Sequence, residues 1–208
     1  MPRPSAETRE LILEVARELF YWEGIRATGV DRVAAAAKVA PTTLYRLFDS
    51  KDGLVAAYME RESRGFRAWF DAAVQAGGSD PRERILAIFD ALSEQVRPEN
   101  CRGCPFLMAL AEFPDADIEA HRHAVDNKAW ARTRFGELTR ELTEADRAGD
   151  AEALADQLAL VMEGVYGSVA ALGTAGPASE ARDLVEFLLR APDSPAASAA
   201  PEDRQAHG

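Results

Sequence analysis

The spacing of apolar residues limits the fold of this 208-residue chain more than any other feature of its sequence. From residue 11 to residue 190, apolar residues recur every three or four positions, which places them on one face of an α-helix. No stretch alternates apolar and polar residues as a half-buried strand does. We therefore expect an all-α protein.

Residues that begin or end helices divide this pattern into about nine helices. The expected ends are Gly24, Gly77-Gly78 and Gly149-Asp150, and the expected starts are Ser5, Ser50 and Ser79-Asp80-Pro81. The expected helices lie near 6–23, 30–37, 41–48, 51–76, 81–96, 104–113, 117–147, 151–173 and 178–190. The last residues, 192–208, are mostly Pro, Ala, Ser and charged residues, so we expect a disordered tail.

The composition excludes several classes of protein. Hydrophobic residues make up 47% of the chain and charged residues 28%, as in an ordinary globular protein. No apolar run approaches the roughly 18 residues of a membrane span, and the N-terminal sequence lacks the apolar segment of a signal peptide. Two cysteines are too few for a disulfide framework. We expect a cytoplasmic protein that does not bind membranes.

The net charge of −11 is unevenly distributed along the chain. Residues 1–53 contain eight basic and eight acidic residues, so the whole negative charge lies beyond residue 53. An acidic body attached to a neutral N-terminal part directs that part toward phosphate groups. The distribution therefore permits DNA binding by the N-terminal part.

Two short helices separated by a turn, near 30–37 and 41–48, form the pattern of a helix-turn-helix. Lys38, Val39 and Ala40 occupy the turn, and the second helix places Leu44 and Phe48 on its inner face. The outward residues of that helix are Thr42, Thr43, Tyr45 and Arg46. Their hydroxyl and guanidinium groups can donate to base edges and phosphates, and Lys51 at the start of the next helix adds a cation.

Less specific interpretations of these residues remain open. Tyr45 is also compatible with a half-buried core position, and Arg46 with a solvated arginine that contacts no base. Thr42 could contact phosphate alone. Taken by itself, Lys51 is an ordinary solvated lysine at the start of a helix.

The sequence from Glu7 to Glu60 resembles the DNA-binding domain of TetR/AcrR-type transcriptional regulators along its whole length. The matching residues are Ala16, Leu19, Phe20, Gly24, Thr28, Val30, Val33, Ala34, Ala37, Val39, Thr43, Leu44, Tyr45, Phe48, Ser50, Lys51 and Leu54. The resemblance implies a three-helix DNA-binding domain over 6–66, with the helix-turn-helix at 29–48. It implies DNA-binding roles for Thr28, Lys38, Thr42, Thr43, Tyr45, Arg46 and Lys51.

The chain departs from the family pattern at three positions. Lys38 replaces a glycine of the turn, which indicates either a turn without a left-handed residue or an added phosphate contact. Ala40 replaces a serine cap, so the second helix would begin with Pro41 alone. Leu47 replaces a histidine or tyrosine and removes one possible backbone contact.

The resemblance further implies that residues 67–191 form a larger helical domain that binds an effector and dimerises. Family members are homodimers joined by their last two helices, here 151–173 and 178–190. Apolar residues of the first of these form a wide stripe beside several small residues. They are Leu154, Leu158, Val161, Met162, Val165, Val169 and Leu172, beside Gly164, Gly167, Ser168 and Ala171. The alternative is that 151–173 is only a central core helix.

The middle helices carry many large apolar residues, which either fill a core or line an effector cavity. Polar residues within apolar runs could orient a small, mostly apolar effector. The candidate effector-binding residues are Phe70, Phe89, Phe106, Glu112, Phe113, Asn127, Trp130, Glu163 and Tyr166.

Cys101 and Cys104 form a C-x-x-C pattern at the start of a predicted helix. A redox role requires a thiolate at the helix N-terminus, and a zinc site requires two further ligands. His121 and His123 lie about 200° apart around a helix and cannot both complete such a site. Packed thiols remain the simplest interpretation, with a redox switch as the alternative.

The sequence thus predicts a dimeric repressor, released from palindromic double-stranded operator DNA by a small, mostly apolar effector. The sequence contains no Ser/His/Asp or Cys/His set and no Gly-rich phosphate loop that would indicate an enzyme. We expect no cofactor and no metal. Two alternatives remain: an activator of the same family, and a small-molecule-binding or enzyme-like helical bundle that has kept a vestigial DNA-binding part.

Overall fold

The computed structural model describes residues 5–97, 99–146 and 150–190, and this part of the chain is helical without strands. Its α-helices are α1 Ser5–Glu23, α2 Val30–Ala36, α3 Pro41–Phe48, α4 Lys51–Ala76, α5 Pro81–Gln95, α6 Pro105–Glu112, α7 Glu119–Asp146, α8 Ala151–Leu172 and α9 Ala181–Arg190. The all-α prediction is confirmed.

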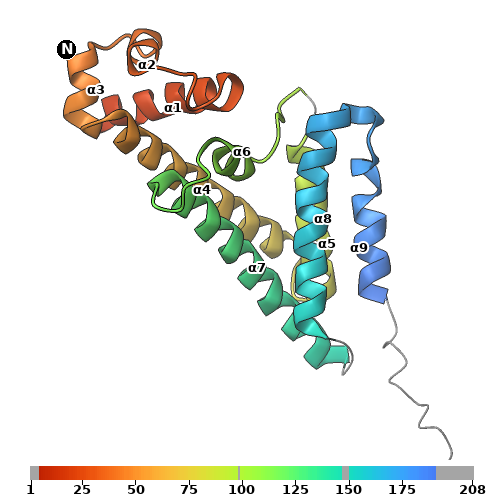
Figure 1. Cartoon of the computed structure of the whole chain (residues 1–208). Helices are drawn as coiled ribbons and strands as arrows, with labels where there is room; N and C mark the ends of the chain where they lie inside the picture. The colour runs from red at the N-terminus through yellow and green to blue at the C-terminus, as the bar shows by residue number, and fades with distance from the viewer. Residues whose placement is uncertain (1–4, 98, 147–149, 191–208) are drawn as a thin grey trace, which may run out of the picture.

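The molecule is elongated, with helices α1, α2 and α3 at one end (Figure 1). Helices α1 and α3 pack against α4, α2 packs on α1 and α3, and we call residues 5–66 the head. The remaining described residues, from 67 to 190, form the body, in which α4, α5, α7, α8 and α9 run lengthwise. Helix α4 continues without a break through residue 66, so the head and the body share this helix.

Capping side chains begin the helices where the sequence predicts them. The Ser50 hydroxyl accepts a hydrogen bond from the Gly53 amide at 3.0 Å. The Asp80 carboxylate accepts from the Arg82 amide of α5, and the Asp150 carboxylate accepts from the Glu152 and Ala153 amides of α8. Gly24 ends α1 with φ +97°, a conformation that strongly favours glycine, and its amide donates to the Phe20 carbonyl at 3.1 Å.

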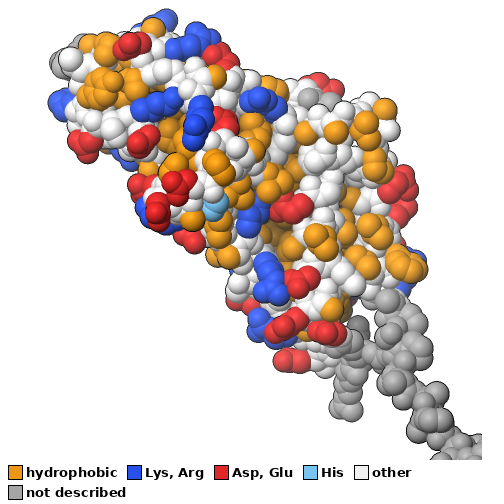
Figure 2. Space-filling model, in the orientation of Figure 1, with side chains coloured by type: hydrophobic (Ala, Val, Ile, Leu, Met, Phe, Trp, Pro, Cys, Tyr) orange, Lys and Arg blue, Asp and Glu red, His pale blue; other side chains and the backbone are white. Residues whose placement is uncertain are grey.

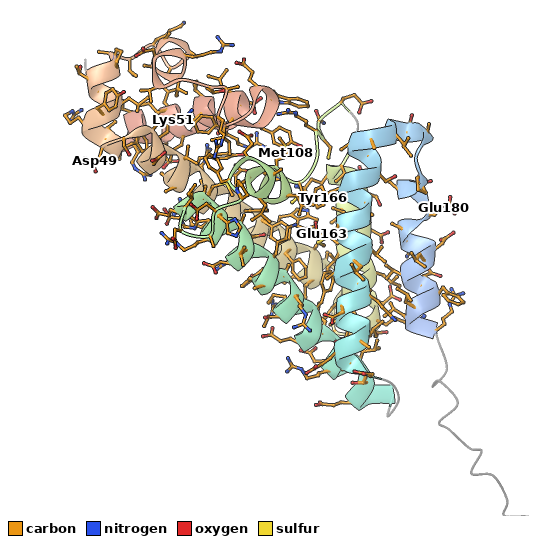
Figure 3. The ribbon with its side chains drawn as sticks, viewed as in Figure 1. Asp49, Lys51, Met108, Glu163, Tyr166 and Glu180 are labelled. Atoms are coloured by element: carbon orange, nitrogen blue, oxygen red, sulfur yellow. The ribbon has the colours of Figure 1, made fainter. Side chains whose placement is uncertain are left out.

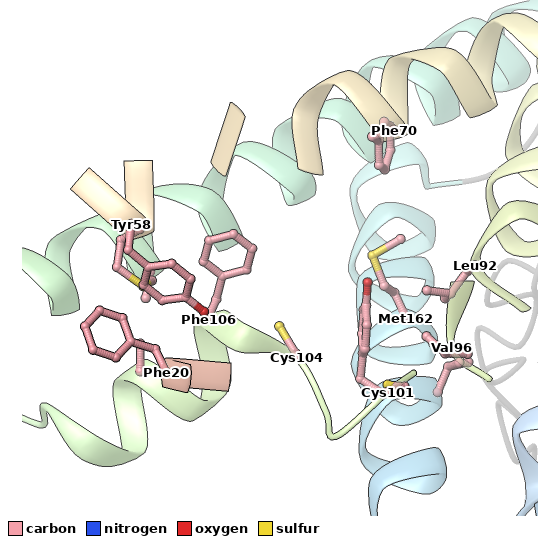
Figure 4. Packing of buried hydrophobic residues seen from close by; sticks show 14 of the residues in the cluster. Phe20, Tyr58, Phe70, Leu92, Val96, Cys101, Cys104, Phe106 and Met162 are labelled. Carbon is pink, nitrogen blue, oxygen red and sulfur yellow. The ribbon is translucent and has the colours of Figure 1, made fainter. Parts of the chain in front are cut away.

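One continuous hydrophobic core joins the head to the body. Figure 4 shows part of it, from Phe20 and Tyr58 through Phe106 to Met162 and Leu92. Phe20 of α1 packs edge-on against Tyr58 of α4, with ring centroids 5.4 Å apart. Because both residues are almost fully buried, the head packs on the first part of α4 as one unit.

The structure differs from the sequence-based expectation in some details. Ser5 lies within α1 instead of preceding it. Helix α9 begins at Ala181, and two 3₁₀ turns, Gly173–Ala175 and Pro177–Glu180, precede it. The expected disordered tail at 192–208 lies outside the described residues. Within the described part, only the stretch Ala151–Ala175 is long and apolar enough to cross a membrane, and a core helix of a soluble protein passes the same test.

Candidate functional site

Helix α3 presents a polar face to solvent because its apolar face is held in the head. Leu44 is fully buried, and Phe48 lies one turn further along the same face. Thr42, Tyr45 and Arg46 are exposed, and Thr43 is partly exposed. As expected, Ala40 provides no side-chain cap, and Pro41 occupies the first turn. The exposed hydroxyl and guanidinium groups of α3 are therefore free to meet a ligand outside the head.

The turn before α3 retains a left-handed residue, although the sequence offers no glycine there. Lys38 has φ 55°, its amide donates to the Ala35 carbonyl at 3.1 Å, and the Val39 amide donates to the Ala34 carbonyl at 3.0 Å. These two bonds form a Schellman motif at the end of α2. The interpretation of a turn without a left-handed residue is thus wrong, and the Lys38 side chain is exposed.

Thr28 lies inside the head. Its side chain is 1% exposed, and its hydroxyl donates to the Gly24 carbonyl at 2.8 Å. The hydroxyl therefore fixes the shape of the loop between α1 and α2, residues 24–29, and does not face solvent.

Lys51 and Tyr45 both lie at the surface of the head but differ in their contacts. The Lys51 ammonium donates to the Arg26 carbonyl at 3.1 Å, which leaves two of its three N–H groups for other acceptors. Tyr45 is 49% exposed. Among the described residues, the side chains of Tyr45 and Arg46 have no hydrogen-bond or ionic partner.

A cavity of about 450 Å³ lies where the head meets the body. Its apolar walls come from α4, α6 and α8 and include Phe66, Trp69, Phe106 and Tyr166. Its polar walls come from α1 and α4 and include Glu14, Arg17, Arg61 and Glu62. Of the nine candidate effector-binding residues, Phe106 and Tyr166 line this cavity.

The sequence did not indicate the polar wall of the cavity. Arg17 and Glu62 belong to helices far apart in the chain, and their ion pair, 3.3 Å from Nε to Oε1, has no local sequence pattern. Burial raises the pKa of the Glu62 carboxyl, and the nearby Arg17 guanidinium opposes this shift. Glu62 is therefore a poorly solvated carboxylate at the border between head and body.

Three of the other aromatic candidates pack in the core of the body. Phe70 and Phe89 are fully buried against Phe135, with centroid distances of 5.3 and 6.0 Å. Trp130 is half-buried, with its ring 5.5 Å from that of Phe70. These rings stabilise the contact of α4 and α5 with α7.

Two polar candidates lie on α7 and α8. Asn127 is fully buried, and neither of its amide atoms has a partner among the described residues. Glu163 accepts a hydrogen bond from the Lys128 ammonium at 2.6 Å. Figure 3 shows Glu163 and Tyr166 on the side of α8 that faces α6 and α7.

The last two candidates, Glu112 and Phe113, contact the head instead of the cavity. The Glu112 carboxylate accepts hydrogen bonds from the backbone amides of Ile25 and Arg26, at 3.0 and 2.6 Å. The Arg26 guanidinium lies over the Phe113 ring, 5.0 Å from its centroid. The C-terminal end of α6 is thereby bound to the loop between α1 and α2.

The segment before α6 is bound to the head as well. The Tyr21 hydroxyl donates to the Gly103 carbonyl at 2.9 Å and accepts from the Arg102 amide at 2.7 Å. The Arg102 guanidinium donates to the Tyr21 carbonyl at 2.7 Å. Burial raises the pKa of Tyr21 to about 12, so the hydroxyl keeps the proton that it donates. Both ends of α6 therefore contact α1 or the loop that follows it.

Cys101 and Cys104 are free and buried. The Lys128 ammonium lies 3.1 Å from the Cys104 sulfur, yet burial raises the pKa of this thiol. Among the described residues, no group of three or more His, Cys, Asp or Glu side chains could hold a metal ion. Both thiols therefore resemble packed cysteines more than reactive ones.

An apolar face remains exposed along α8 and α9. On α8 it consists of Leu160, Gly164, Gly167 and Ala171, whose spacing places them in one row. On α9, Leu184 and Phe187 are 47% and 68% exposed. Figure 2 shows hydrophobic side chains over these two helices. Most of the stripe predicted from the sequence, including Leu158, Met162, Val165 and Val169, is instead buried inside the single chain.

Comparison with known proteins agrees with this geometry. Residues 12–58 match the model of bacterial regulatory proteins of the tetR family. The crystal structure of SCO4454, a TetR-family transcriptional regulator from Streptomyces coelicolor, is 32% identical, with a TM-score of 0.81 over 89% of this chain and 95% of that one.

Two curated regulators of Escherichia coli are also similar. The HTH-type transcriptional regulator YjdC is 26% identical over 182 residues, which are 88% of this chain and 93% of YjdC. The HTH-type transcriptional repressor NemR is 27% identical over 124 residues, which are 59% of this chain and 62% of NemR. The chain is a ligand-responsive DNA-binding transcriptional regulator of the TetR family.

Proposed function

We propose that this regulator is a cytoplasmic repressor that binds a palindromic operator as a homodimer and leaves it when a small, mostly apolar effector binds. The observation that carries the proposal is the cavity at the border of head and body, since α1 of the head and α4, α6 and α8 all contribute to its walls. A molecule bound there contacts both parts at once. The relative NemR is a transcriptional repressor, which supports this direction of control.

The exposed face of α3 is the part that enters the major groove. Thr42, Thr43 and Arg46 lie where they can donate to base edges, and their hydroxyl and guanidinium groups suit that role. Tyr45, together with Lys38 and Lys51, contacts phosphates on either side. The buried Thr28 supports this surface through the Gly24 carbonyl and does not touch DNA through its hydroxyl.

A second copy of the chain covers the apolar α8/α9 face, defined by Leu160, Gly164, Gly167, Ala171, Leu184 and Phe187. One small DNA-binding module buries only about 600–1,000 Å² of its surface on DNA, too little for strong discrimination. Two heads joined through this face contact two half-sites, about 34–36 Å apart or a multiple of that distance. The small residues of α8 allow the helices of two copies to approach closely.

The cavity has the size and lining of a small-molecule site. Its volume of about 450 Å³ lies within the ordinary range for ligand pockets, and its aromatic side chains stand beside the charged side chains of α1 and α4. The effector must prefer the dimer state in which the two heads no longer fit one operator. A coupling of about 1–3 kcal/mol is sufficient for such a switch.

Substitution of Gly167 by Arg tests the dimer on which operator binding depends. Among the described residues of the single chain, no atom lies within 4 Å of a Cβ at this position, so the folded monomer accommodates the change. Loss of a glycine within a helix stabilises that helix by up to about 1 kcal/mol. In a dimer the same arginine overpacks the interface and buries a charge, which costs several kcal/mol.

We expect Gly167→Arg to sediment as a monomer with unchanged helix content by circular dichroism, and to bind operator only at the non-specific level. Ala129→Arg, at an exposed position of α7, is the matched control and should remain a dimer with wild-type affinity. A monomeric Gly167→Arg protein with wild-type operator affinity would contradict the dimer mechanism. A variant that remains dimeric would show that the interface lies elsewhere.

A further inference from the structure

One residue of the body touches the loop that leads into the helix-turn-helix. Glu112 is the last residue of α6, and its two carboxylate oxygens accept from the consecutive amides of Ile25 and Arg26, at 3.0 and 2.6 Å. Hydrogen bonds to a charged acceptor are roughly twice as strong as neutral ones. The left-handed Gly24 immediately before these amides makes the tight turn that directs both of them toward α6.

Arg26 of this loop also contacts Lys51, to which we assign a contact with DNA phosphate. The Arg26 carbonyl accepts a hydrogen bond from the Lys51 ammonium at 3.1 Å. Arg26 is therefore bound through its amide to Glu112 and through its carbonyl to Lys51. Its guanidinium stacks over Phe113, which adds a third contact between this residue and the end of α6.

We propose that Glu112 is a positioning residue for DNA binding, which holds Arg26 so that Lys51 points its ammonium at a backbone phosphate. This inference rests on the proposed function, because it takes operator binding by the head as given. A lysine side chain has four rotatable bonds, and its carbonyl partner limits their freedom before DNA arrives. Without Glu112 the loop amides lose their acceptors and the carbonyl of Arg26 is no longer fixed.

Helix α6 connects the Glu112 contact to the cavity, so a bound effector can alter it. Pro105 and Phe106 at the start of α6 line the cavity, and Glu112 at its end holds the loop. Helix α6 has only eight residues, so a displacement of its start by a bound molecule reaches Glu112 within two turns. The path from the cavity to a phosphate contact then consists of Phe106, Glu112, Arg26 and Lys51.

A double-mutant cycle on operator binding tests the proposal without any knowledge of the effector. The substitutions are Glu112→Ala and Lys51→Ala, alone and together, in the full chain, with affinity measured at several salt concentrations. We expect Glu112→Ala to reduce operator affinity about tenfold, or about 1.4 kcal/mol. It should also lower the slope of log affinity against log salt toward that of Lys51→Ala, although Glu112 itself is acidic and lies on the body. In the Lys51→Ala background, Glu112→Ala should change affinity less than about twofold, because the contact that it positions is already absent.

Tyr21→Phe is the matched control. The Tyr21 hydroxyl bonds Arg102 and Gly103 in the same contact between head and body but has no contact with Arg26 or Lys51. Its effect on affinity should therefore add to that of Lys51→Ala, and the salt slope should not change.

Additive effects of Glu112→Ala and Lys51→Ala, or an unchanged salt slope in Glu112→Ala, would overturn the proposal. If Glu112→Ala fails to fold, Glu112→Gln, which keeps one acceptor oxygen, is measured against the same two criteria. A wild-type protein that binds no operator would overturn the proposed function, and this inference with it. Normal wild-type binding with an additive cycle would overturn this inference alone.

Discussion

Substitution of Lys38 by glycine should stabilise this protein, although it removes a side chain. Lys38 occupies the left-handed position of the Schellman motif that ends α2, with φ 55°. The Cβ of a residue other than glycine is crowded in this conformation. The Lys38 side chain is exposed, so its removal opens no cavity.

The expected gain follows from two opposing effects. A left-handed residue other than glycine is less stable by about 1–2 kcal/mol, which glycine relieves. Glycine also increases the conformational entropy of the unfolded chain, which offsets about 0.5–1 kcal/mol of that gain. These ranges leave a net gain between about 0 and 1.5 kcal/mol, and from their midpoints we expect Lys38→Gly to raise the free energy of unfolding by about 0.5–1 kcal/mol. For a chain of this size, this corresponds to an increase in Tm of about 1–4 °C.

Thermal unfolding followed by circular dichroism measures this change, with Lys38→Ala as the control. Alanine removes the same charge but keeps the Cβ, so the control should gain no stability. A Lys38→Gly protein no more stable than Lys38→Ala would refute the argument from backbone strain. Operator binding tests the phosphate contact of Lys38 separately from its backbone conformation. If the ammonium neutralises a phosphate, Lys38→Gly and Lys38→Ala should both lower the slope of log affinity against log salt by about 0.9 for each head.

Three further predictions concern the head, the cysteines and the cavity. Tyr45→Phe and Lys51→Ala should weaken binding to every DNA sequence about equally, but only Lys51→Ala should lower the salt slope, by about 0.9 for each head, in titrations followed by fluorescence anisotropy. An unchanged slope would contradict the phosphate role of Lys51. The double variant Cys101→Ser/Cys104→Ser should bind operator as the wild type does, because both thiols are buried. If mild oxidation releases DNA from the wild type but not from this variant, the cysteines form a redox switch instead. Burial raises the pKa of Glu62, so the carboxyl ionises less readily in the folded protein than in the unfolded chain. The free energy of unfolding should therefore fall as pH rises from the ordinary glutamate pKa through the raised value. Denaturant unfolding at a series of mildly acidic pH values should show this loss of stability in the wild type and not in Glu62→Gln. Parallel profiles of unfolding free energy against pH for the two proteins would contradict the prediction.

Local signals in the sequence predicted most of the fold. Ser50, Gly24 and the Asp80-Pro81 pair act on their own neighbours in the chain, so the helix ends that they mark are confirmed within a few residues. The left-handed Lys38 was missed because lysine rarely adopts this conformation, so its residue type did not predict it. The start of α9 differs because the turn at Pro177–Glu180 is helical in spacing but 3₁₀ in its hydrogen bonds.

Contacts over long separations limited the prediction of the site. The outward face of α3 follows from helical spacing alone, so its residues could be named from the sequence. Glu112 bonds amides 86 and 87 residues away, and no local pattern encodes such a contact. Val169 looks like an interface residue in the sequence, whereas it is buried within one chain and Gly167, two positions away, remains exposed. Helical spacing predicts which residues share a face, but not which helix will cover that face.

Selection of bound fragments from a pool of genomic DNA tests the central claim most directly. Wild-type protein and Gly167→Arg are each incubated with the pool at physiological salt, and the bound fragments are sequenced. The account predicts that the wild type enriches a palindromic site with half-sites about one DNA turn apart or a multiple of it, with a Kd of about 10⁻⁸–10⁻¹¹ M. Gly167→Arg should enrich no site. A wild-type protein that enriches no sequence over the starting pool, or that enriches one without two-fold symmetry, would contradict the account.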